Sequence, residues 1–150
     1  MKKEYIEFKG ENGYKYNTII WLPDEEVKCV VQVVHGMTEH MERYNDFASV
    51  LTEVGIGVVG FDLRGHGENA TESTCASFEE TGWDMSLKDI ETFHNMMKKR
   101  FPSVKHYLLG FSLGSFLVRE YFSVYNKNDF SGAIIIGTGQ QLFLPHFIKY

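Results

Sequence analysis

The chain has 150 residues, 43% of them hydrophobic, and a formal net charge of −5, which suits one domain with a single core. Its basic residues form no patch larger than Lys98-Lys99-Arg100, so nucleic acid is not an expected partner. No stretch approaches the ~18 apolar residues of a membrane span, and no apolar signal region follows the first lysines, so we expect a cytoplasmic protein. Cys29 and Cys75 lack disulfide or metal-ligand spacing, and we expect neither a metal nor a cofactor.

Apolar runs alternate with helical patterns, which predicts an α/β fold with a mostly parallel sheet and helices on both faces. Residues 4–8 and 14–22 flank the turn sequence Gly10-Glu11-Asn12-Gly13 and are expected to form an antiparallel hairpin at one edge of the sheet. Residues 27–34 (VKCVVQVV) are almost all apolar or β-branched, as in a strand that is buried on both faces.

The next helix is predicted from four apolar residues that share one helical face: Tyr44, Phe47, Leu51 and Val54. Gly55 can end this helix in a left-handed conformation. Residues 56–61 return as a strand, and residues 62–82 are a long polar loop. In this loop, Arg64-Gly65-His66-Gly67 favours a structural turn over a phosphate site, because no Walker or dinucleotide pattern surrounds it. An amphipathic helix follows and ends near Pro102. Its apolar positions are Met85, Leu87, Ile90, Phe93 and Met97.

The stretch Gly110-Phe111-Ser112-Leu113-Gly114 follows the apolar sequence Tyr107-Leu108-Leu109 and precedes an apolar helix. A serine on a sharp strand-to-helix turn exposes its hydroxyl at the carboxyl edge of the sheet, and Gly110 and Gly114 allow close backbone approach. Ser112 is therefore the predicted nucleophile. The N–H of Leu113, at the start of the helix, is a predicted oxyanion donor. The structural alternative is an ordinary glycine-rich turn.

A second predicted donor lies at the carboxyl end of the 27–34 strand, in His35-Gly36-Met37. The N–H of Met37 and that of Leu113 would converge on one carbonyl oxygen. For His35 we favour a structural role, in which the ring hydrogen-bonds the loop, over a catalytic imidazole. Gly36 then belongs to the supporting loop together with His35.

Three segments in this order, residues 35–44 (HGMTEHMERY), 61–67 (FDLRGHG) and 110–114 (GFSLG), resemble the monoacylglycerol lipase and lysophospholipase branch of the α/β-hydrolases. The resemblance covers residues 6–139 and implies a serine carboxylester hydrolase of single-chain acyl lipids, such as a monoacylglycerol or a lysophospholipid. Phe111 departs from the pattern, because these lipases often carry His before the nucleophile.

In this fold the acid and the histidine of a triad follow the nucleophile. Glu120 lies within the helix after Ser112, Asp129 precedes the predicted strand 132–137 at the amino end of the sheet, and His146 is the last histidine. We therefore expect residues 1–139 to be the amino-terminal part of an α/β-hydrolase core that is truncated before its last strands. By resemblance, residues 140–150 begin a lid that can contact a lipid surface transiently. The apolar strand 132–137 would then have a free edge and would favour self-association.

Two classes of function remain open. In the favoured one, Ser112 attacks an acyl ester with Met37 and Leu113 as oxyanion donors, and a histidine and an acid beyond Tyr150 complete the relay. In the other, the chain is a non-catalytic α/β-hydrolase-like binding or scaffold protein. Serine peptidases and thioesterases share the same turn around the nucleophile and are further alternatives.

Overall fold

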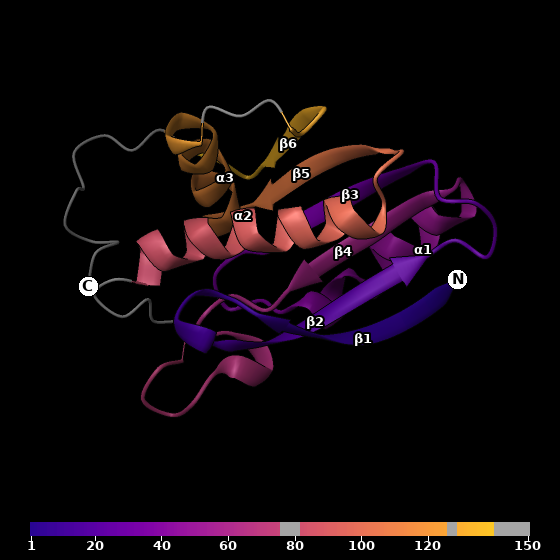
Figure 1. Cartoon of the computed structure of the whole chain (residues 1–150). Helices are drawn as coiled ribbons and strands as arrows, with labels where there is room; N and C mark the ends of the chain where they lie inside the picture. Colours follow the sequence, from indigo (N-terminus) through magenta and orange to yellow (C-terminus); the bar gives the residue numbers. More distant parts are fainter. Residues whose placement is uncertain (76–81, 126–128, 140–150) are drawn as a thin grey trace.

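The computed structural model describes residues 1–75, 82–125 and 129–139 (Figure 1). This part of the chain contains six strands in one sheet: β1 (Lys2–Lys9), β2 (Lys15–Leu22), β3 (Cys29–Val34), β4 (Ile56–Phe61), β5 (Lys105–Phe111) and β6 (Gly132–Ile136). The spatial order is β1-β2-β4-β3-β5-β6. The hairpin β1–β2 pairs antiparallel to β4, whereas β4, β3, β5 and β6 run parallel. The predicted α/β fold with an edge hairpin is confirmed.

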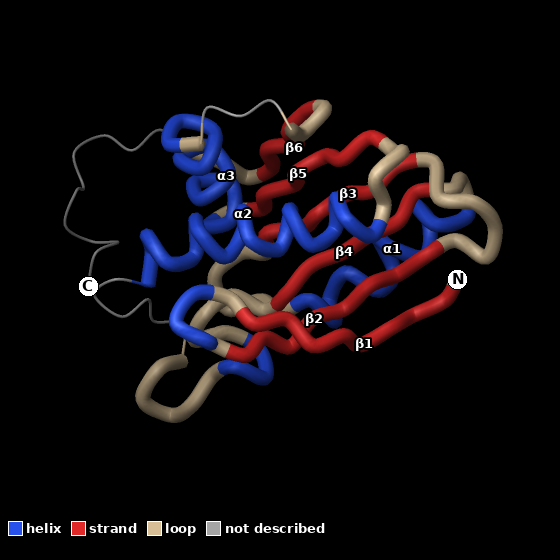
Figure 2. Tube along the Cα trace, viewed as in Figure 1, coloured by secondary structure: helices blue, strands red, loops and turns tan. Residues whose placement is uncertain are grey.

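Helices cover the two faces of the sheet unequally (Figure 2). The helix α1 (Asn45–Glu53) packs on one face over β4 and β2, while α2 (Gly82–Arg100) and α3 (Leu113–Val124) pack on the other. Short 3-10 turns complete the described structure: η1 (Glu11–Gly13), η2 (Met41–Tyr44) and η3 (Gly67–Asn69).

The predicted apolar face of α1 is confirmed only in part: Tyr44 and Leu51 pack against the buried core, but the other two members do not. Phe47 is 37% exposed and Val54 56% exposed, whereas Ala48 and Thr52 are buried. The small side chains of Ala48 and Thr52 let the helix approach the sheet closely. The Thr52 hydroxyl donates to the Ala48 carbonyl at 2.9 Å, so burial of Thr52 leaves no unpaired donor. The predicted left-handed Gly55 is confirmed at φ 90°.

The apolar helix predicted after Ser112, α3, is buried on one side only. Leu117, Val118 and Tyr121 are buried, but Val124 is exposed. The helix lies on one face of the sheet beside α2, so its outer side meets solvent. The strand β3 begins at Cys29, two residues after its predicted start.

The strand β6 forms the sheet edge next to β5. Its apolar side chains are poorly covered in the described part of the chain, since Ile134 is 40% and Ile136 44% exposed. This confirms the expectation of an apolar edge. The remainder of the predicted polar loop, residues 76–81, and the predicted lid start, residues 140–150, which include His146, lie outside the described residues.

Candidate active site

Ser112 occupies the turn between β5 and α3 with φ 49° and ψ −115°. This backbone region is strained for a residue with a side chain and costs of order 1–3 kcal/mol. Hydrogen bonds hold the conformation: the Ser112 N–H donates to the Ile136 carbonyl at 2.9 Å, and the Ser112 carbonyl accepts from the Ser115 N–H at 2.9 Å. The sharp turn predicted around Ser112 is therefore present.

The two glycines of the turn are needed for space. A Cβ on Gly110 would lie 2.5 Å from the Gly114 carbonyl oxygen, and a Cβ on Gly114 would lie 2.0 Å from the Val34 oxygen. Both distances are far below contact distance, so only glycine lets β5, α3 and the end of β3 approach this closely.

The loop after β3 lies directly against this turn. Val34 pairs with Gly110 in the parallel ladder, which places both strand ends at one edge of the sheet. A Cβ on Gly36 would lie 3.2 Å from the Ser112 Cβ. The structure thus brings Gly36 beside Ser112, while Met37 is largely exposed and Leu113 is buried at the first turn of α3.

His35 is fully buried below this loop. Its Nε2 accepts a hydrogen bond from the Leu63 N–H at 2.8 Å, and its Nδ1 lies 2.8 Å from the Gly36 carbonyl oxygen. Burial lowers the pKa of His35 to about 4, so the ring is neutral at pH 7.

Two carboxylates fix the rest of the loop, and sequence reasoning gave neither of them a role. Glu39 Oε2 accepts the Gly36 N–H at 2.9 Å and the Tyr44 hydroxyl at 3.1 Å. Asp62 Oδ1, at the end of β4, accepts the Met41 N–H at 2.6 Å. The spacing of Glu39, three residues after Gly36, matches that of a capping-box glutamate, which accepts a backbone N–H three residues before it, and was the available signal.

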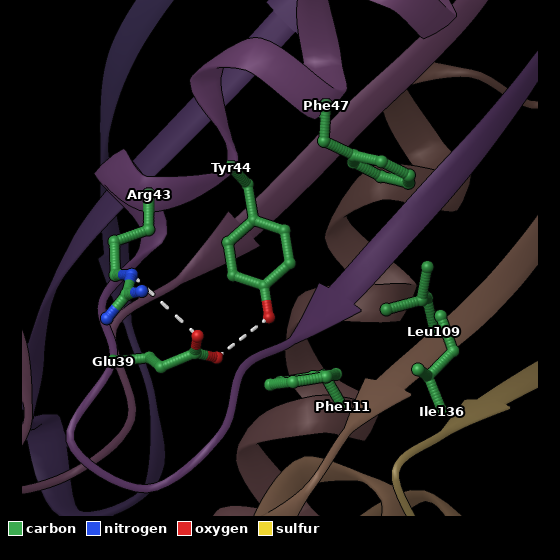
Figure 3. Close-up of a pocket in the computed structure, with 7 residues that line it drawn as sticks. All are labelled: Glu39, Arg43, Tyr44, Phe47, Leu109, Phe111 and Ile136. Atoms are coloured by element: carbon green, nitrogen blue, oxygen red, sulfur yellow. Dashed lines mark hydrogen bonds and ion pairs between the residues drawn. The ribbon is translucent and has the colours of Figure 1, made fainter.

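A cavity of about 260 Å³ opens beside the same loop (Figure 3). Its walls are mainly apolar, and the carboxylate of Glu39 lies at one end, with the guanidinium Nε of Arg43 3.8 Å away. The lining comes from η2, α1, β5, β6 and the loop after β3: Glu39, Arg43, Tyr44, Phe47, Leu109, Phe111 and Ile136. The cavity therefore combines an apolar surface with a polar end, and Phe111, the residue before Ser112, forms part of its wall.

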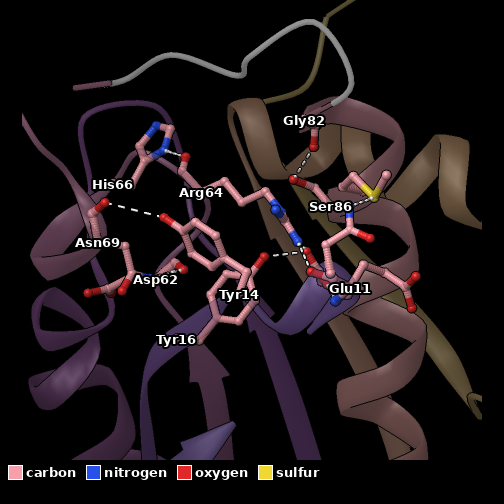
Figure 4. Close-up of polar contacts among 12 residues, drawn as sticks. Glu11, Tyr14, Tyr16, Asp62, Arg64, His66, Asn69, Gly82 and Ser86 are labelled. Atoms are coloured by element: carbon pink, nitrogen blue, oxygen red, sulfur yellow. Dashed lines mark hydrogen bonds and ion pairs between the residues drawn. The ribbon is translucent and has the colours of Figure 1, made fainter. Parts of the chain in front are cut away.

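The segment 64–67 is fixed by a buried polar cluster (Figure 4). Arg64 Nε lies 2.8 Å from Asp89 Oδ2, and the guanidinium stacks 4.5 Å from the centre of the Tyr14 ring. Asp89 also accepts the Glu11 N–H at 2.6 Å and the Tyr16 hydroxyl. The Arg64 side chain is thus committed to an ion pair within the fold.

The two acidic residues after Ser112, which the sequence does not favour as the triad acid, have other places in the fold. Glu120 on α3 accepts the Trp83 indole N–H at 2.7 Å, and Asp129 precedes the amino end of β6. Within residues 1–75, 82–125 and 129–139, no cluster of three or more His, Cys, Asp or Glu side chains could hold a metal ion. In the same part of the chain, no helix is both long enough and apolar enough to cross a membrane.

The family model described as "Serine aminopeptidase, S33" matches residues 25–147. Among curated proteins, a monoacylglycerol lipase of Mycolicibacterium smegmatis is 27% identical over 132 residues, covering 87% of this chain and 45% of that protein. A monoglyceride lipase of Rattus norvegicus is 29% identical over 116 residues, covering 77% of this chain and 37% of the relative. The chain therefore spans less than half the length of these relatives.

Solved structures agree on the fold. A thermostable carboxyl esterase from Bacillus coagulans, in complex with glycerol, superimposes with a TM-score of 0.80 at 27% identity, covering 93% of this chain and 45% of that one. A soluble variant of the Saccharomyces cerevisiae monoglyceride lipase, in complex with a substrate analogue, gives a TM-score of 0.72 at 23% identity, covering 87% and 42%.

Proposed function

The chain belongs to the serine aminopeptidase S33 family of α/β-hydrolases, and we propose that it carries the nucleophile and the oxyanion donors of a serine esterase for single-chain acyl lipids. The observation that carries this proposal is the strained turn at Ser112, which contacts Gly36 in the loop after β3. Structures keep a costly backbone conformation where it serves a function, and here it would expose one hydroxyl beside two backbone N–H groups.

In the proposed reaction, the Ser112 oxygen attacks the ester carbonyl while its proton passes to a general base. The N–H groups of Met37 and Leu113 stabilise the oxyanion that forms. The tetrahedral intermediate then collapses, the alcohol leaves with the proton, and water later releases the acid from Ser112. We assign the base and its orienting acid to residues outside the described part of the chain, in keeping with relatives about twice as long.

The cavity supports the substrate class. Its apolar wall, which includes Phe111 next to Ser112, suits an acyl chain. Monoglyceride lipases among the relatives and a glycerol-bound esterase among the structural neighbours support the monoacylglycerol, and the lysophospholipid is kept as the second member of the proposed class.

Labelling of the full-length protein with a fluorophosphonate probe tests the nucleophile. We expect mass spectrometry to find the probe on Ser112 alone, and Ser112→Ala to abolish labelling. Ser123→Ala, on the exposed side of α3, is the matched control and should label normally. Labelling that survives in Ser112→Ala refutes the assignment, and an unlabelled wild-type protein favours a non-catalytic binding or scaffold role.

A substrate panel tests the ester class. The description of the family model favours a peptidase as the second candidate. Turnover of a monoacylglycerol, a lysophospholipid, a triacylglycerol, an acyl thioester and an aminoacyl amide should be compared. We expect the first two to be preferred, whereas preference for the amide would establish the peptidase instead.

A further inference from the structure

Resting on the proposed function of Ser112, we infer that His35 is a positioning residue, which holds the Gly36–Met37 peptide so that the Met37 N–H faces the substrate carbonyl. The ring touches neither substrate nor Ser112 in this role. It acts on the reaction only through the orientation of one peptide group.

The hydrogen bonds of His35 define which nitrogen carries the proton. The Leu63 N–H can only donate, so Nε2, at 2.8 Å, must be the unprotonated acceptor. A neutral ring then carries its proton on Nδ1, which donates to the Gly36 carbonyl oxygen at 2.8 Å. The N–H of Leu63 thus selects the tautomer that can bond to the loop.

This bond fixes the direction of the proposed donor. The Gly36 carbonyl and the Met37 N–H belong to the same planar trans peptide and point in opposite directions. Holding the oxygen on the His35 side therefore turns the N–H away from the buried ring.

Gly36 is the residue that needs such restraint. The approach of Ser112 leaves little room for a side chain, because a Cβ on Gly36 would lie 3.2 Å from the Ser112 Cβ. A glycine, however, rotates freely about both of its backbone bonds. Glu39 holds its N–H at 2.9 Å and His35 holds its carbonyl, so the peptides on both sides of Gly36 are fixed.

The restraint extends to the loop after β4. Leu63 lies between Asp62, which bonds to the Met41 N–H, and Arg64, which pairs with the buried Asp89. Besides burial, the groups that act on the charge of His35 are the Gly36 carbonyl, which favours protonation through its hydrogen bond, the His66 ring, which disfavours it, and the carboxylates of Asp62 and Glu39, which favour it. Since burial lowers the pKa of His35 to about 4, the neutral tautomer described above persists at pH 7.

Two near-isosteric variants separate positioning from packing. In His35→Asn, the amide nitrogen can replace Nδ1 as donor to the Gly36 carbonyl. In His35→Gln, the longer amide can accept from the Leu63 N–H but leaves that carbonyl without its donor. We expect phosphonylation of Ser112 to slow about 100-fold in His35→Gln, the effect of losing one oxyanion donor, and less than about 10-fold in His35→Asn. For ester turnover, the loss should fall on kcat rather than KM, because the oxyanion forms only in the transition state.

Nitrogen-15 spectra of the wild-type protein provide a readout that needs no activity. We expect a protonated Nδ1 and an unprotonated Nε2 for His35, and a Met37 amide resonance that moves in His35→Gln but not in His35→Asn. A proton on Nε2, or equal rates in two variants of equal urea midpoint, overturns the inference. Should Ser112 fail to label in the wild type, the proposed function fails, while the tautomer and the Met37 resonance still decide whether His35 orients the peptide.

Discussion

Replacing Ser112 by glycine should stabilise the protein while removing the proposed nucleophile. The residue has φ 49° and ψ −115°, a backbone region that glycine adopts without strain. For a residue with a side chain, this conformation costs of order 1–3 kcal/mol of strain energy. Glycine also raises the entropy of the unfolded chain, which offsets about 0.5–1 kcal/mol of that relief. We therefore expect Ser112→Gly to exceed Ser112→Ala in the free energy of unfolding by about 1 kcal/mol.

Urea unfolding measures this difference. With a denaturant slope of about 2 kcal/mol per molar, the midpoint of Ser112→Gly should lie about 0.5 M above that of Ser112→Ala. The backbone hydrogen bonds of the residue, to the Ile136 carbonyl and from the Ser115 N–H, are retained in both variants.

A helical serine supplies the matched control. Ser123 is exposed on α3, and glycine there should be less stable than alanine by up to about 1 kcal/mol, because helices disfavour glycine. The glycine-minus-alanine difference should thus have opposite signs at positions 112 and 123. If Ser112→Gly is as unstable as Ser112→Ala, or less stable, then the turn stores no strain and the reasoning is refuted.

Four further outcomes follow from the packing. Gly114→Ala should lower the free energy of unfolding in urea by more than about 3 kcal/mol, because its Cβ would lie 2.0 Å from a backbone oxygen of β3. In Gly132→Ala the nearest atom is 3.4 Å from the new Cβ, so the free energy of unfolding should change by less than about 1 kcal/mol. Asp89→Asn should cost about 3–5 kcal/mol, because it leaves the guanidinium of the cluster in Figure 4 without its counter-charge; a loss below about 1 kcal/mol would contradict this. His94 is fully buried, neither ring nitrogen has a hydrogen-bond partner among the residues that the structure describes, and its pKa is lowered by burial from 6.5 to about 4. The unfolded chain therefore binds an extra proton at His94, and this residue alone should lower stability by about 2 kcal/mol between pH 7 and pH 5, a contribution that His94→Phe should remove. Ile136→Lys should decrease self-association of the 150-residue chain in sedimentation velocity, and an unchanged profile would show that the β6 edge is not responsible.

Much of the fold is predictable because its signals are local. The hairpin follows from the glycines around residues 10–13, and the strand at 56–61 from an apolar run between Gly55 and Asp62. The turn at Ser112 is equally local, since strand, turn and helix follow one another without interruption. In each case, the residues that determine the element also lie within it.

The remaining features depend on partners distant in the sequence. The exposed side of α1 could not be predicted, because it depends on which strands the helix covers, and these are β4 and β2. The Asp89 cluster joins η1, β2, the loop after β4 and α2, so no short sequence motif predicts it. The same is true of Leu63, whose N–H selects the proton position on His35.

The pairing of Val34 with Gly110 also determines when the site can exist during folding. Its two halves, the loop after β3 and the turn after β5, are separated by about half of the chain, and only the central parallel ladder joins them. Loop closure of this length is slow compared with formation of the β1–β2 hairpin. A nascent chain would thus complete its hairpin early and bring the Ser112 turn and the loop after β3 together in one late step.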